Sequence, residues 1–485
     1  MAAINEPTTA LVLGAGFSAA ISSDMPTANE LGNRAYRYVK DGGGSATFKR
    51  DFSIDFPFEL ALSLLAEKQP HLSELENRRN AVRLAELTEG ISTALEEAQE
   101  IAFKSQPPNW LYELLSVLNQ WHSTIVSLNQ DLVIETAVES RFLTPTTPRP
   151  LIPNASRMEI LASGGSTEQI DATDILWHVP PLADGTQQRQ RNLAKSMRLL
   201  KLHGSVDWWW APPDQTGGTI LREGVYGTFG KALRMSDQAR RDYLPGRERF
   251  IVPPLSTKSS YFDNPITRQL WQDAFKSLQY AGRIAIVGYS LPITDHMTFG
   301  LLQSVLERRV VRLDVVNSNI AELLPRLKAL VGAGRDDPLP SWVQTYDGID
   351  AIETYVHDLA DDRNRELVDE IKCSLPPGEA IRSVHVHWPR RNGITTRRVH
   401  SVEGPDADGV VTLTTATVEP TDNLDSRIDY DPNVELSEVT LADLIPRLDG
   451  ATSLVARHGS SEAFRVISYQ VNVPWIMLHP AGLVI

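Results

Sequence analysis

Six short apolar runs, each followed at once by small or polar residues, constrain the fold of this chain more than any other feature. Apolar runs of this length are typical of strands that helices cover on both faces, as in a parallel sheet. Between the runs, apolar residues recur with the period of a helix. We therefore expect a doubly wound, Rossmann-like parallel α/β sheet. The predicted strands are 9–13, 123–128, 197–202, 249–252, 283–287 and 311–316, and the predicted helices are 58–65, 84–101, 110–118, 267–280 and 320–330.

The α/β pattern predicts one domain over residues 1–372. A stretch of helical patterns over about 51–118 is too long for one crossover between strands, and it predicts a helical insertion. Two further excursions, 144–195 and 211–248, are rich in Pro, Gly and polar residues and predict irregular loops at the same edge.

A Pro-Pro-Gly break at 376–378 marks a change of pattern. Beyond it, apolar and polar residues alternate at 383–388, 410–415 and 465–473, with turn residues between these stretches. We therefore expect a β-rich domain over 373–485 with a regulatory or assembly role.

Charge and cysteine content exclude several classes of protein. With 47 Lys and Arg against 61 Asp and Glu, the 485-residue chain has a formal net charge of −14, which disfavours direct binding to nucleic acid. One cysteine, Cys373, cannot build a disulfide framework or a multi-cysteine zinc site, so no zinc is expected. The sequence also shows no signal peptide and no long apolar run, which predicts a cytoplasmic protein without a membrane span.

The first predicted strand runs into a Gly-rich turn, Gly-Ala-Gly-Phe-Ser at 14–18, that leads into a helix. Such a turn can bring backbone amides close to a pyrophosphate, or it can be a simple packing device. A dehydrogenase would also need an acidic residue at the end of a second strand about 20 residues further on. Residues 32–39 have a helical pattern instead, which disfavours a dehydrogenase.

Polar or small residues also follow the other predicted strands, at 127–131, 201–205, 288–292 and 316–318. The carboxyl ends of parallel strands border the crevice where ligands bind in such sheets. A lone Asn, Asp or His at such a place is often only a turn or cap residue. Several together favour a nucleotide site.

The order of these motifs resembles the sirtuin (silent information regulator) superfamily. The shared motifs are Gly-Ala-Gly-Phe-Ser at 14–18 with Met-Pro-Thr at 25–27, Asn129-x-Asp131, Leu-His-Gly at 202–204, Gly-Tyr-Ser at 288–290 and Val-Asn at 316–317. The resemblance spans most of residues 8–372. It implies that NAD is the ligand and that the bond between nicotinamide and ribose is broken.

The resemblance also implies a role for each matching residue. Asn129 would position the ribose or the attacking water, Asp131 would hold the nicotinamide carboxamide, and His203 would be the general base. A structural role for His203 beside a tight turn is the alternative. The other residues expected to contact NAD, at its phosphates and adenosine, are Gly14, Ala15, Gly16, Ser18, Pro26, Thr27, Gly288, Ser290 and Asn317.

Two departures separate this chain from the protein-deacylating sirtuins. It lacks their cysteine zinc ribbon, and Pro-Thr-Ala-Asn at 26–29 replaces their Pro-Asp-Phe-Arg segment. The pattern is more similar to the sirtuin-like domains of bacterial antiphage defence proteins, which hydrolyse NAD and halt the infected cell. This predicts an NAD hydrolase that releases nicotinamide and ADP-ribose in abortive infection. The alternatives are an NAD-dependent deacylase and a non-catalytic NAD or ADP-ribose sensor.

An enzyme that depletes NAD is toxic and needs an inactive state. The resemblance implies control through a homo-oligomer, a partner ATPase, an Argonaute-type partner or a cyclic nucleotide. The Trp-Trp-Trp run at 208–210 could stack on a base or could anchor the following loop in the core.

Overall fold

The computed structural model forms two compact units, which are described separately. The first holds residues 1–108, 123–140 and 149–352, and the second holds 109–122, 141–148 and 353–485. None of the described helices is both long and apolar enough to cross a membrane. The structure describes residues 9–45, 52–53, 56–121, 123–142, 198–210, 221–222, 229–230, 246, 248–252, 265–292, 294–309, 311–374, 384–390, 393–403, 412–418, 436–440, 451–458, 463–470 and 475–479.

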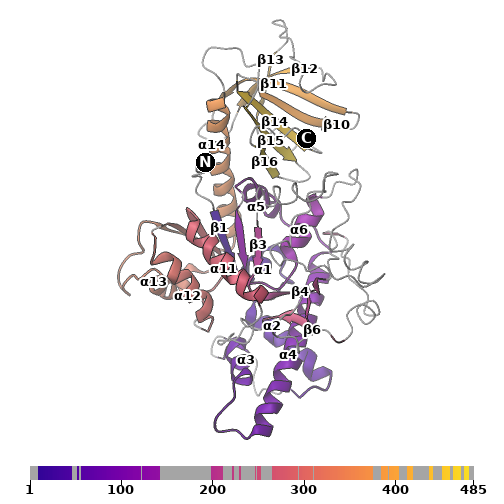
Figure 1. Cartoon of the computed structure of the whole chain (residues 1–485), viewed down its shortest axis with the longest axis vertical. Coiled ribbons are helices and arrows are strands. Elements are labelled where there is room, and N and C mark those ends of the chain that lie inside the picture. The colour runs from indigo at the N-terminus through magenta and orange to yellow at the C-terminus, as the bar shows by residue number, and fades with distance from the viewer. Residues whose placement is uncertain are drawn as a thin grey trace. The chain divides into compact units, whose positions relative to one another are not determined.

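The first unit contains a six-stranded sheet in which every neighbouring pair of strands is parallel. Its strands β1 and β3 are labelled in Figure 1. The strand order is β3-β2-β1-β7-β8-β9, so the direction of winding reverses between β1 and β7. This confirms the predicted Rossmann-like, doubly wound sheet. The strands are β1 (Thr9–Leu13), β2 (Thr124–Ser127), β3 (Arg198–Lys201), β7 (Arg283–Val287), β8 (Arg312–Asn317) and β9 (Val343–Asp347).

The prediction that residues 249–252 form a strand of this sheet is wrong. β6 (Glu248–Ile251) pairs antiparallel with β4 (Gly204–Trp210), in a separate three-stranded sheet completed by β5 (Leu221–Arg222). The sixth strand of the parallel sheet is β9, which was not predicted. Because β9 is an edge strand, most of its residues are exposed and it lacks an apolar run.

Helices flank the parallel sheet. α11 (Pro265–Tyr280) packs against β2 and β3, α13 (Ile320–Leu330) packs against β9, and α12 (His296–Leu306) contacts both helices. α1 (Ala15–Ile21) connects β1 to the helices that follow, and α6 (Val133–Phe142) follows β2. The predicted loops at 144–195 and 211–248 lie almost wholly outside the described residues.

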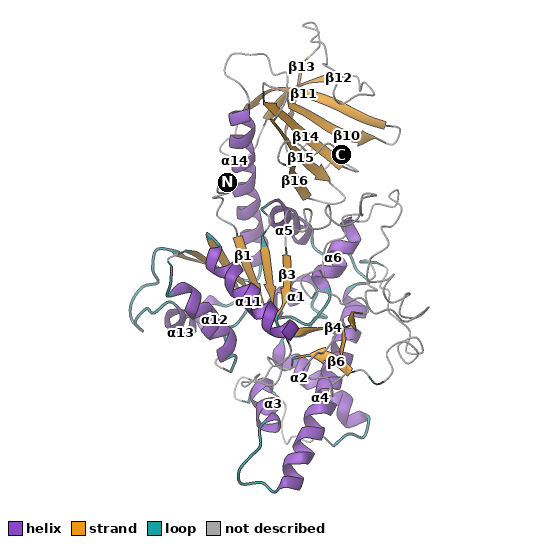
Figure 2. Ribbon diagram, viewed as in Figure 1, coloured by secondary structure: helices purple, strands orange, loops and turns teal. Residues whose placement is uncertain are grey.

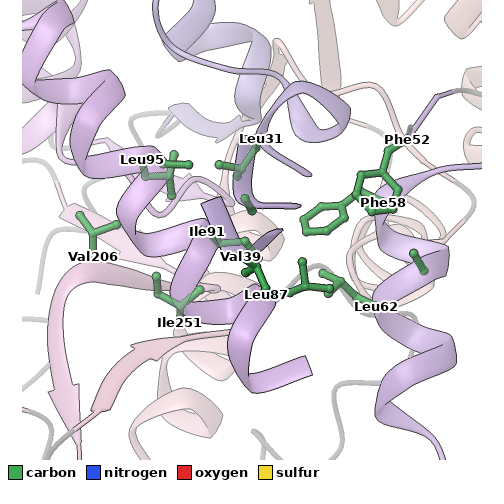
Figure 3. Packing of buried hydrophobic residues seen from close by; sticks show 13 residues of the cluster. Leu31, Val39, Phe52, Phe58, Leu62, Leu87, Ile91, Leu95, Val206 and Ile251 are labelled. Carbon is green, nitrogen blue, oxygen red and sulfur yellow. The ribbon is translucent and has the colours of Figure 1, made fainter. Parts of the chain in front are cut away.

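The helical excursion between β1 and β2 has a core of its own (Figure 3). α2 (Ala28–Asp41), α3 (Phe58–Ala66) and α4 (Glu74–Ala102) pack around it, together with one residue each from β4 and β6. The burial of these apolar side chains orders the excursion as part of the first unit. The buried members of the cluster are Leu31, Ala35, Val39, Phe52, Phe58, Ala61, Leu62, Leu87, Ile91, Ala94, Leu95, Val206 and Ile251.

The Trp-Trp-Trp run at 208–210 begins with a buried residue. Trp208 is 1% exposed, and its ring centroid lies 6.3 Å from that of Phe250 in a stacked arrangement. Trp210 meets the same phenyl ring edge-on at 5.1 Å, and the Arg249 guanidinium lies 4.6 Å from the centre of the Trp209 ring. These contacts show that the run anchors β4 in the core.

The second unit contains an antiparallel sheet of seven strands in the order β13-β12-β11-β10-β14-β15-β16 (Figure 2). This confirms that the C-terminal region is rich in strands. The unit also includes α5 (Asn109–Gln120) and most of α14 (Ala351–Ser374). The strands are β10 (Val384–Arg390), β11 (Gly393–Glu403), β12 (Thr412–Val418), β13 (Leu436–Thr440), β14 (Ala451–His458), β15 (Ala463–Gln470) and β16 (Trp475–His479).

Candidate active site

Most of the predicted site residues lie at one edge of the parallel sheet. Gly14 follows β1, Asn129 and Asp131 follow β2, His203 follows β3, Gly288 follows β7 and Asn317 ends β8. Because all these strands are parallel, their carboxyl ends meet at the same edge. Hydrogen bonds join the residues that follow β1, β2 and β3 into one cluster.

The Gly-rich turn after β1 packs directly on the turn after β7. The Gly14 amide donates to the Val287 carbonyl over 3.0 Å, and the Gly16 amide donates to the Gly288 carbonyl over 2.9 Å. A Cβ atom on Gly14 would lie 2.6 Å from the Tyr289 Cα, so no larger residue fits there. Close packing thus accounts for these glycines. The Ala15 amide, by contrast, occupies the first position of α1, where a helix provides no carbonyl partner.

Ser18, Asn129 and Asp131 form a hydrogen-bonded group between α1 and the turn after β2. The Asn129 side-chain amide donates to the Gly14 carbonyl and to the Ser18 hydroxyl, each over 3.0 Å. The Ser18 hydroxyl donates in turn to Asp131 Oδ2 over 2.7 Å, and Asp131 Oδ1 accepts from the Val133 amide at the start of α6. Since Nδ2 makes both of these contacts, Oδ1 is the atom of the Asn129 side chain that can accept a further hydrogen bond.

His203 is 6% exposed and lies beside the same turn. Its Nδ1 is 3.1 Å from the Leu128 carbonyl oxygen, which can only accept, so this nitrogen carries the proton. In the neutral imidazole Nε2 is then the basic nitrogen. The His203 ring centroid lies 6.4 Å from that of Trp271 on α11. The Gly204 backbone, with φ +72°, takes the chain sharply from β3 into β4.

Two buried charged residues that were not predicted from the sequence lie next to this cluster. The Lys201 ammonium and the Glu135 carboxylate form an ion pair of 2.9 Å, and their side chains are 1% and 2% exposed. The Lys201 ammonium also donates to the Asp131 backbone carbonyl and to the Ser205 hydroxyl. A lysine that interrupts the apolar run at 197–202 was the one signal that could have revealed this pair.

The remaining residues that were predicted to contact NAD on its adenosine side lie on the turns after β7 and β8. The Tyr289 hydroxyl donates to Asp295 Oδ2 over 2.8 Å; burial, and then the negative charge of Asp295, raise the pKa of this phenol well above its ordinary value. The Asn317 side-chain amide approaches the Tyr289 carbonyl at 3.5 Å, and Ser290 is exposed. Gly288, Ser290 and Asn317 therefore lie on adjoining turns.

Pro26 and Thr27 precede α2, and the side-chain hydrogen bonds of Thr27 go to Glu30 and not to the cluster around Asn129. Pro26 is buried and Thr27 is exposed. The Thr27 amide and hydroxyl both donate to Glu30 Oε2 over 2.8 Å, in a capping box. These bonds, the amide first, hold the pKa of the Glu30 carboxyl below its ordinary value. Thr27 thus has a structural role at the helix start.

Replacing Thr27 by Ala is expected to destabilise the first unit by about 1 kcal/mol at pH 7, because the hydroxyl of the cap is lost. Glu30 ionises more readily in the folded protein, so the cap stabilises the fold above the ordinary pKa of 4.5 and loses this effect as pH falls through the lower folded value. The difference in unfolding free energy between wild type and Thr27→Ala should shrink accordingly below pH 4.5, as urea unfolding at several pH values would show. An undiminished difference at low pH would contradict the cap.

Comparison with known proteins yields little for this sequence. No protein-family model and no curated protein matches it. One solved structure, described as "Structural Basis for the Mechanism and Regulation of Sir2 Enzymes", is 12% identical and covers 75% of this chain and 95% of its own, with a TM-score of 0.31. Among the described residues, no three His, Cys, Asp or Glu side chains are grouped so that they could hold a metal ion.

Proposed function

We propose that this chain hydrolyses NAD at the bond between nicotinamide and ribose, releasing nicotinamide and ADP-ribose. One observation carries the proposal: the turn after β2 holds both candidate groups, because His203 Nδ1 donates to the Leu128 carbonyl and the neighbouring Asn129 is fixed by its bond to the Gly14 carbonyl. The resemblance of the motifs at 14–18, 129–131, 202–204 and 288–290 to sirtuin-like NAD hydrolases supports the choice of substrate.

The chemistry needs groups of these kinds. When the C1′–N bond breaks, the bonding electron pair leaves with nicotinamide, and the ribose becomes a cation resembling an oxocarbenium ion. A water molecule then forms the new C1′–O bond and gives up a proton. Asn129 Oδ1 would orient the ribose hydroxyl or this water, and His203 Nε2 would accept the proton. Asp131 would orient the carboxamide of nicotinamide with the lone pairs that Ser18 and Val133 do not use.

Two other functions remain as alternatives. A deacylase would consume NAD only with an acylated peptide and would form acyl-ADP-ribose. A sensor would bind NAD without turnover. The hydrolase is favoured over the sensor because a buried histidine with an oriented basic nitrogen serves proton transfer, which binding alone does not require.

The proposed biological role is NAD depletion in antiphage defence, with the activity repressed until infection. Repression through a homo-oligomer, a partner ATPase or an Argonaute-type partner is part of this proposal. The antiparallel sheet of the second unit is a candidate for the regulatory or assembly element.

The proposal is tested by incubating the purified chain with NAD, with and without extract of infected cells, and separating the products by chromatography. We expect nicotinamide and ADP-ribose in equal amounts without any acyl peptide. His203→Ala is expected to lower the rate about 10²-fold, because the general base is lost.

The products separate the alternatives. Acyl-ADP-ribose formed only with an acyl peptide would identify a deacylase. Bound NAD without turnover under every condition would identify a sensor, and either result would refute the hydrolase.

A further inference from the structure

Lys201 is a buried cation at the end of β3, two residues before His203. Its ammonium group has three hydrogens and three acceptors in the protein. These are Glu135 Oε1 at 2.9 Å, the Ser205 hydroxyl at 2.9 Å and the backbone carbonyl of Asp131. Every donor is therefore used, and the positive charge is balanced by the Glu135 carboxylate.

The three acceptors belong to different parts of the site. The Asp131 carbonyl ends the turn that carries Asn129, Glu135 lies on α6, and Ser205 follows His203 by two residues. The Ser205 hydroxyl also lies 3.4 Å from the Gln130 carbonyl, which accepts a hydrogen bond from the Val206 amide over 3.0 Å. One ammonium group thus links the turn after β2 to the turn after β3.

His203 and Lys201 bind the two ends of the same turn. His203 Nδ1 donates to the Leu128 carbonyl, and Lys201 donates to the Asp131 carbonyl. Asn129 lies between these two carbonyls. The distance between Asn129 and His203 is consequently set from both sides by side chains near the end of β3.

We propose that Lys201 is a positioning residue for the proposed NAD cleavage: it holds the 128–131 turn so that Asn129 and His203 act on the same ribose. The inference rests on the proposed function and goes beyond it, because Lys201 touches no substrate. A purely structural ion pair would be replaceable, since apolar residues of similar volume often substitute for a buried pair without loss of stability.

The test uses the double variant Lys201→Met with Glu135→Leu in the full-length chain, which removes both charges and leaves no buried charge unpaired. We expect its melting temperature to stay close to that of wild type. We expect kcat for nicotinamide release to fall about tenfold to a hundredfold with little change in KM, because the reacting groups are misplaced while NAD still binds. Amide hydrogen exchange over residues 128–133 should become faster than in wild type.

The control is the double variant Arg283→Met with Asp314→Leu. This buried ion pair links the amino-terminal parts of β7 and β8, away from the edge of the sheet that carries the cluster. Asp314 also pairs with Arg312, whose side chain is 43% exposed and also donates to Gln344, so its charge stays in contact with solvent in the double variant. The control should leave nicotinamide release and exchange over 128–133 as in wild type, so that any loss in the Lys201 variant is specific.

Two results would overturn the positioning role: a stable Lys201 variant with wild-type kcat, or one with lower kcat and wild-type exchange over 128–133. Failure of the proposed function is recognised separately, by a wild-type protein that releases no nicotinamide. Exchange over 128–133 still shows in that case whether Lys201 fixes the turn, and unchanged exchange would refute it.

Discussion

Gly288→Ala is expected to destabilise the first unit by about 3 kcal/mol or more. The residue has φ +63°, and a Cβ atom would lie 2.2 Å from the Phe17 amide nitrogen and 2.6 Å from the Gly16 carbonyl carbon. Both neighbours are backbone atoms of the turn after β1, so no side-chain rotation can relieve the clash. Thermal and urea unfolding of the purified variant would measure the loss.

Gly300→Ala is the matched control for this prediction. Gly300 lies inside α12, and nothing is within 4 Å of the position that its Cβ would take. Alanine there should stabilise the protein by up to about 1 kcal/mol, because alanine is the better helix former. Equal melting temperatures for wild type and Gly288→Ala would show that the two glycine turns are not packed as described.

The sequence predicted best those strands that have both faces covered. β1 and β7 are buried along their whole length and β8 is buried except at its ends, and the predicted bounds of all three agree with the structure to within about one residue. β9 was not predicted, because it is an edge strand whose exposed polar residues break the apolar pattern. β6 has an apolar run as well, but its partner is set by the reversal of the chain at Gly204, which periodicity does not reveal.

For the candidate site, motif order predicted the residues and not their contacts. That Ser18 bridges Asn129 and Asp131 depends on β1 and β2 being neighbours, which is a property of the tertiary structure. The contact between Gly16 and Gly288 likewise depends on the tertiary structure. This close contact is the reason why glycine occupies both positions. Lys201 was not predicted because the sequence does not show which residue pairs with a lysine inside an apolar run. The tertiary structure identifies this partner as Glu135.

Asn129→Ala is expected to lower nicotinamide release on the order of 10³-fold, the largest effect on activity that we predict. The substitution removes Oδ1, the proposed contact to the ribose hydroxyl or the water. It also removes the amide that donates to the Gly14 carbonyl and the Ser18 hydroxyl. The group that orients the substrate and the bonds that hold this group are lost together. Initial rates at saturating NAD, measured under the conditions in which the wild type is active, would give the ratio.

Asn33→Ala separates this effect from a general loss of stability. The Asn33 side chain on α2, like that of Asn129, makes two hydrogen bonds, donating to the Phe52 carbonyl over 3.1 Å and accepting from the Phe52 amide over 2.8 Å. Its loss should cost a similar free energy of unfolding, about 1–3 kcal/mol, and leave the rate of nicotinamide release unchanged. Because both variants lose two bonds of one amide, a rate loss confined to Asn129→Ala comes from the cluster around Asn129 and not from a general loss of stability. Equal rate losses in the two variants would mean that Asn129 acts through the fold alone, and the catalytic cluster would then have to be sought elsewhere on the same sheet edge.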